Sequence, residues 1–173
     1  MKQIVQAFFV IGIAAMIGCQ EKKDERQEYI HRIQAIFQNN ALHGHDSSQI
    51  LMDSLIRECE RFVKNYPTDS LTPGMYMKMA TLQADQGRDD MALKVYDRII
   101  TAYAGKKEEA MALFAKSLIY QEKKNDIVSA KKCWEEIIKK FPDLTLAKDA
   151  KILLDNANLS PEELLKKITS QNS

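Results

Sequence analysis

The chain has 173 residues, and its 25 Lys and Arg against 24 Asp and Glu give a formal net charge of +1. This balance argues against nucleic acid or an anionic surface as the main partner, because both require a clustered excess of basic residues. Six glycines and four prolines are too few for a strand-and-turn architecture or a disordered chain. The composition therefore favours a helical protein with a mixed-charge surface.

The N-terminus has the features of a secretory signal. Residues 1–18 carry one charge, Lys2, and an apolar run of about 14 residues, whereas a helix needs about 20 to cross a bilayer. Residues 16–19, Met-Ile-Gly-Cys, resemble a bacterial lipobox, which implies cleavage before Cys19 and lipid on its thiol and amine. The alternative is a buried N-terminal helix with an incidental cysteine.

A charged tract follows the cysteine. Residues 20–26 have no apolar side chain, so residues 19–27 are predicted to be the lipidated cysteine and a tether. The tract resembles those of surface-exported lipoproteins, although a plain solvated spacer has the same composition. By analogy with enterobacterial sorting, Gln20 favours the outer membrane. We therefore expect a lipid anchor in the outer membrane, on the periplasmic face or the cell surface.

Residues 28–173 are expected to form the helical domain. The apolar residues of a first helix share one face: Tyr29, Ile30, Ile33, Ile36 and Phe37. A second helix is expected to start at Ser47 or Ser48 and to stop before Pro67. Between them, His43, His45 and Asp46 are possible metal ligands, but zinc sites usually assemble four ligands, and a solvated loop is the favoured interpretation. We predict no metal site.

The sequence then repeats itself. Three predicted helix ends align, namely residues 62–70 (FVKNYPTDS), 99–107 (IITAYAGKK) and 137–145 (IIKKFPDLT). Upstream of the last two, Gly87 and Asn125 can take the positive φ of a turn. In each unit an alanine follows, and an aromatic residue lies one helical turn beyond it. Such helix pairs cannot bury their apolar faces alone, so stacked neighbours must cover them.

The pattern resembles tetratricopeptide repeats. The first unit matches at Tyr76, Met79, Ala80, Gln83, Gly87, Ala92 and Tyr96, and the second, with one residue inserted before its turn, at Ser117, Tyr120, Asn125, Ala130, Trp134 and Pro142. Units of 37 or 38 residues, rather than 34, are similar to the longer repeats of envelope lipoproteins. The resemblance implies an all-α fold: a short right-handed α-solenoid of antiparallel helix pairs, with a repeat core over residues 49–157.

Residues 158–173 are predicted to cap the stack. Ser160-Pro161-Glu162-Glu163 is a capping box. It starts a short helix whose apolar stripe is Leu164, Leu165 and Ile168, with lysines outside. A terminal helix with a polar outer face keeps a solenoid soluble.

The sequence contains no recognisable catalytic motif, so we predict neither an enzyme nor a cofactor. Cys59 and Cys133 fall on second helices two units apart, beyond the reach of about 7 Å that a disulfide allows, and are predicted to be buried thiols.

In the repeat family, first-helix residues line a groove that receives a peptide or a helix. The resemblance places in it Met77, Thr81, Ala84, Asp85, Met111, Phe114, Leu118, Gln121 and Glu122. The alternative for Met77, Met111, Phe114 and Leu118 is ordinary core between repeats. The expected function is a non-catalytic, lipid-anchored adaptor for a protein partner in the envelope. A cell-wall or glycan-binding factor is the second candidate, but it requires exposed aromatic platforms, and Trp134 falls at a packing position.

Overall fold

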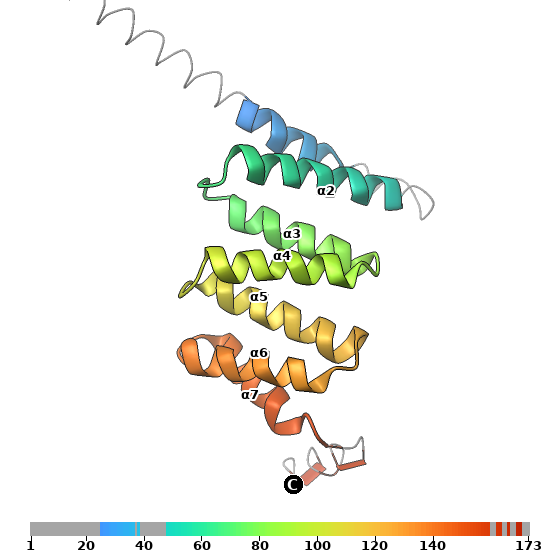
Figure 1. Ribbon diagram of the computed structural model, residues 1–173. Helices are drawn as coiled ribbons and strands as arrows, with labels where there is room; N and C mark the ends of the chain where they lie inside the picture. The colour runs from blue at the N-terminus through green and yellow to red at the C-terminus, as the bar shows by residue number, and fades with distance from the viewer. Residues whose placement is uncertain are drawn as a thin grey trace, which may run out of the picture. The chain divides into compact units, whose positions relative to one another are not determined.

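The computed structural model describes residues 25–36, 38, 48–159, 162, 163, 166, 169 and 170. Within these ranges there is no β-strand, and residues 25–36 are helical. The labelled elements that follow are α2 (Ser48–Asn65), α3 (Thr72–Asp85), α4 (Asp89–Ala102), α5 (Lys107–Leu118), the π-helix η2 (Ile119–Lys123), α6 (Ile127–Lys140) and α7 (Thr145–Asn156). Figure 1 shows this all-α fold, which confirms the predicted class.

The chain forms two compact units, Met1–Met75 and Tyr76–Ser173, which divide inside α3. In the second unit α4 packs on α5, α5 on α6 and α6 on α7, and α5 also contacts α7. The buried cluster that joins α5, α6 and α7 consists of Ala110, Leu113, Ala130, Cys133, Trp134, Ile137, Phe141, Ala147 and Ala150. In the second unit, neighbouring helices thus bury their apolar faces against one another, as expected for a tetratricopeptide-like solenoid.

The turn residues of the two repeats have the predicted backbone conformation. Gly87 has a φ of 71° and Asn125 a φ of 50°. The small and aromatic residues that follow each turn, Ala92, Tyr96, Ala130 and Trp134, are all buried. The alanines therefore lie at close helix contacts, and the aromatic rings fill the space beside them, as the sequence predicts.

The residue inserted in the second repeat is accommodated by η2. The Lys124 amide donates to the Ile119 carbonyl, five residues back, at 3.1 Å, and the Asp126 amide reaches the Tyr120 carbonyl, six back, at 2.7 Å. In the first repeat the Arg88 amide closes the corresponding turn on the Gln83 carbonyl, only five residues back. A π-helical turn includes one residue more in its hydrogen-bonded ring than an α-helical turn does. The extra residue therefore fits without displacing the turn at Asn125.

In the first unit, the helix over residues 25–36 packs on α2, which begins at Ser48 and ends at Asn65, as predicted. Its Tyr29 ring makes edge contacts with Phe62 and Tyr66. Arg26 forms an ion pair of 2.6 Å with Asp69. The predicted tether, residues 19–27, includes Glu25, Arg26 and Gln27, whereas all three lie in this helix. The reason is that the Arg26 guanidinium has a carboxylate partner on the same unit, so its charge does not exclude it from packing.

Several predicted features lie outside the described residues. They are the signal segment 1–18, Cys19, Phe37, the residues His43, His45 and Asp46, and most of the C-terminal cap, including Leu164, Leu165 and Ile168. No helix in the described ranges is long and apolar enough to span a bilayer.

Candidate functional site

The predicted groove residues all lie on α3, α5 and η2, and none is fully buried. Thr81, Asp85, Met111 and Glu122 are exposed, whereas Met77, Ala84, Phe114, Leu118 and Gln121 are half-buried. Met111 exposes 42% of its surface although it is a large apolar residue. These residues therefore remain accessible after the repeats have packed.

The α5 part of this surface has an apolar centre. Met111, Phe114 and Leu118 are three and four residues apart, which places them on one face of the helix. Phe114 also packs against the buried cluster of the second unit, so its ring is partly core, as the alternative interpretation proposed. The adjoining face of α5 supplies Ala110 and Leu113 to that cluster. The helix thus has one face in the core and one directed outward.

Helix α7 extends this surface in a way that sequence analysis missed. Lys148 and Lys151 follow Met111 and Phe114 by 37 residues, the repeat length, and both are exposed. Lys151 forms an ion pair of 3.3 Å with Asp155 on the next turn. By this register, the two lysines occupy the positions on α7 that Met111 and Phe114 occupy on α5, and the two helices are in contact. Continuing the repeat register beyond residue 145 would have identified them.

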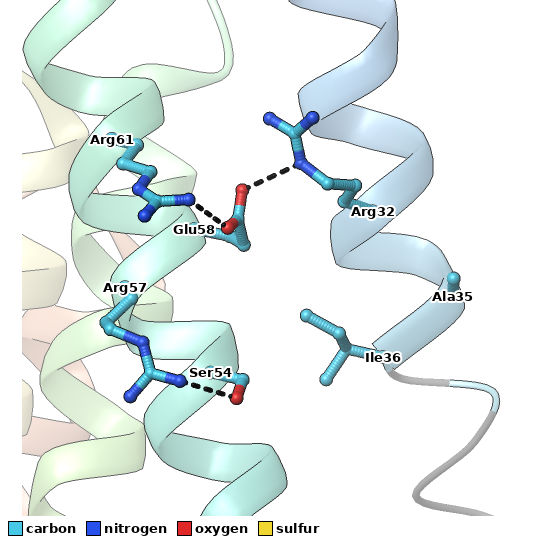
Figure 2. Close-up of a pocket in the computed structure, with 7 residues that line it drawn as sticks. All are labelled: Arg32, Ala35, Ile36, Ser54, Arg57, Glu58 and Arg61. Carbon is cyan, nitrogen blue, oxygen red and sulfur yellow. Dashed lines mark hydrogen bonds and ion pairs between the residues drawn. The ribbon is translucent and has the colours of Figure 1, made fainter.

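The first unit contains a second, polar site, which we name the arginine cleft. It is a cavity of about 400 Å³ between the helix over residues 25–36 and α2, lined by Arg32, Ala35, Ile36, Ser54, Arg57, Glu58 and Arg61. Figure 2 shows Arg32 and Arg61 pointing toward Glu58, and Arg57 turned away from it toward Ser54. Ile36 points from the facing helix toward α2 (Figure 2).

Glu58 organises the upper part of the arginine cleft. It accepts a hydrogen bond of 3.0 Å from Arg32 Nε and one of 2.8 Å from Arg61, so it joins the two helices. Its side chain is only 12% exposed. The hydrogen bond to Glu58 raises the pKa of the Arg32 guanidinium above its ordinary value. Arg57 instead donates to the Ser54 hydroxyl at 2.8 Å, and it forms no ion pair within the described part of the chain.

The buried reactive groups have structural roles. Glu109, whose side chain is 1% exposed, accepts hydrogen bonds of 2.7 Å from Lys140 and 2.6 Å from the Gly105 amide, which fixes the start of α5 to α6. Cys59 and Cys133 are buried thiols that form no disulfide, as predicted. Burial raises the pKa of Cys133 to about 11. The described residues also contain no cluster of His, Cys, Asp or Glu able to hold a metal ion.

Comparison with known families supports the repeat assignment. Residues 75–106 and 111–144 match the sequence model of the tetratricopeptide repeat. The first match covers most of α3 and α4, and the second covers most of α5, η2 and α6. The searches of curated proteins and of solved structures found no significant match.

Proposed function

We propose that this chain, which carries two tetratricopeptide repeats, is a non-catalytic adaptor that binds a protein partner on its first-helix surface. The observation that supports this most directly is α5, which places Ala110 and Leu113 in the core but leaves Met111 42% exposed. Flexible thioether side chains suit a surface that adapts to another protein. The partner would contribute an extended segment or a helix with apolar side chains for Met111, Phe114 and Leu118.

The place of action is part of the same proposal. The lipobox-like residues before Cys19 and the charged tract after it support a lipid anchor in the outer membrane, where the repeats would hold their partner. The glycan-binding alternative loses its tryptophan platform, because Trp134, the single tryptophan of the sequence, is fully buried. Peptide mapping of protein extracted from its native membrane tests the anchor. A mature chain that begins at acylated Cys19 is expected, and an unmodified chain that retains residues 1–18 would contradict it.

The binding surface is tested by affinity capture from the native envelope, solubilised in mild detergent. Met111→Glu introduces a charge at the centre of the apolar face of α5, and the captured partner should be lost. Met91→Glu is the matched control, since Met91 is 51% exposed on α4, outside the proposed surface. Capture by the Met91→Glu variant should equal that of the unmodified chain. Equal recovery of every co-purifying protein with Met111→Glu would exclude this surface as the binding site.

A further inference from the structure

We propose that the arginine cleft is a binding site for a phosphate group. Its lining residues carry three guanidinium groups and one carboxylate, that of Glu58. Glu58 pairs with both Arg32 and Arg61, and Arg32 also pairs with Glu28 on its own helix, while Arg57 donates to the Ser54 hydroxyl. With Glu28 counted, three guanidinium groups face two carboxylates, so Arg57 is the guanidinium without an ionic partner among the described residues, and an anion would supply one.

The arrangement on α2 also favours an anion. Arg57 and Arg61 are four residues apart on one helix face, a spacing at which like charges repel, and only Arg61 of the two is paired with Glu58. Arg32 adds a third cation from the facing helix, held in place by Glu58. A bound anion between them would turn this repulsion into attraction. Arg57 is thus the member of the cluster that the packing of the two helices leaves unexplained and that an anion would stabilise.

The directions of the donors indicate which anion. A planar carboxylate is satisfied by one guanidinium fork, whereas phosphate presents oxygens in three dimensions. Here the donors come from two helices: Arg32 from one side, and Arg57 and Arg61 from the other, with the Ser54 hydroxyl beside them. Arginine is also the residue that binds phosphate oxygens in pairs. A tetrahedral oxyanion would accept donors from both walls once Arg57 turns from Ser54 into the cleft, which a planar carboxylate would not.

The remaining wall of the cleft is apolar. Ala35 and Ile36 lie on the helix that faces α2, so a phosphate ester with a small apolar portion fits better than inorganic phosphate. Such an ester has two sources, a soluble metabolite or a phospholipid headgroup. The phospholipid source depends on the lipid anchor at Cys19, which is part of the proposed function. The described helix begins six residues after Cys19, and an extended chain spans about 3.5 Å per residue, so the start of this helix would lie within about 20 Å of the bilayer. The cleft residues Arg32, Ala35 and Ile36 lie further along the helix, which rises about 1.5 Å per residue, so the cleft would lie within about 40 Å of the bilayer.

Calorimetric titration of the purified full-length chain with glycerol 3-phosphate tests the site without requiring an anchor or a protein partner. Binding is expected, and Arg57→Gln should weaken it about tenfold or more, since a hydrogen bond to a charged group contributes about 1.5–3 kcal/mol. Arg57→Lys should recover only part of the affinity, because an ammonium lacks the planar fork. Lys94→Gln removes one positive charge from an exposed position on α4 and should leave binding unchanged. Acetate at equal ionic strength should not compete.

Flotation with vesicles identifies the source. Phosphatidylcholine vesicles, with and without phosphatidylglycerol, are compared for the unmodified chain, Arg57→Gln and Lys94→Gln. A loss of phosphatidylglycerol-dependent flotation in Arg57→Gln alone assigns the site to a headgroup, and a response confined to glycerol 3-phosphate assigns it to a soluble ester. The proposal is overturned if neither probe binds, if Arg57→Gln and Lys94→Gln behave alike, or if acetate competes as well as phosphate. Circular dichroism of each variant verifies that it is folded.

Discussion

Trp134 and Ser117 are joined inside the second unit by a hydrogen bond of 2.7 Å, in which the indole Nε1–H donates to the serine hydroxyl. Both side chains are fully buried. The hydroxyl in turn donates to the Phe114 carbonyl on its own helix at 2.6 Å. Ser117 thus meets two requirements of the repeat. It is small enough to let α5 and α6 approach, and it satisfies the buried indole.

Ser117→Ala is therefore expected to destabilise the protein although it keeps the small side chain. It leaves the Trp134 N–H buried without an acceptor, at a cost of about 1–3 kcal/mol in the free energy of unfolding. Urea denaturation measures this loss. In a double-mutant cycle with Trp134→Phe, the serine change should cost less in the Phe background, because no donor remains there. An equal cost in both backgrounds would show that the hydrogen bond contributes nothing.

Gly87→Ala should lower stability by about 1 kcal/mol through the backbone alone, since left-handed geometry costs a residue with a Cβ about 1–2 kcal/mol. At Gly87, φ is +71° and no atom lies within 4 Å of an added Cβ, so the expected loss involves no clash. Gly74→Ala, in helix α3 and equally open, should instead stabilise by about 0.5–1 kcal/mol. Thermal unfolding of both variants checks the opposite signs. Two losses of similar size would contradict the backbone argument.

The pairing of Glu109 with Lys140 predicts a pH dependence of stability. Burial raises the pKa of Glu109, but the hydrogen bonds from Lys140 and the Gly105 amide outweigh it, and the net pKa is below the ordinary value of 4.5. A carboxyl with a depressed folded-state pKa contributes stability above its unfolded pKa, and the contribution is lost as the pH falls through the folded value.

Glu109→Gln should consequently cost about 1–3 kcal/mol near neutral pH and progressively less below about pH 4. Urea midpoints from about pH 7 down to about pH 3 measure the difference between the two proteins. Glu136→Gln breaks the more exposed pair with Lys140 and should cost less than about 1 kcal/mol at every pH. A Glu109→Gln deficit that does not change with pH would disprove the ionic contribution.

Sequence reasoning recovered the repeat because the repeat depends on local signals. The backbone of the turns requires a positive φ at Gly87 and Asn125, and close helix packing requires small residues at Ala92 and Ala130. These requirements leave a recognisable spacing in the sequence. The inserted residue was also detected as a shift in register. The sequence did not predict that this residue would form a π-helix at Ile119–Lys123, because a loop longer by one residue satisfies the same spacing.

The arginine cleft was not predictable in the same way. Arg57 and Arg61 share a helix face by their spacing, but Arg32 is 25 residues away, and only the packing of two helices brings it opposite them. The net charge of +1 does not reveal this cluster, because acidic residues elsewhere in the chain balance it. The composition therefore argued against an anionic partner although cations are in local excess. Glu109 was missed for a related reason, since a charged residue is rarely fully buried unless its partner is known.

The two buried cysteines are expected to resist alkylation in the native protein. Because the pKa of the Cys133 thiol is about 11, roughly one molecule in a thousand carries the thiolate at about pH 8. Only the thiolate reacts with iodoacetamide. Cys59 is fully buried, and its thiol donates to the Met75 sulfur at 3.9 Å. Both residues should therefore be alkylated orders of magnitude more slowly in the native protein than in urea, as peptide mapping by mass spectrometry would measure. Rapid native alkylation of Cys133 would mean that α5 and α6 separate readily, and the close packing of the second repeat would then be wrong.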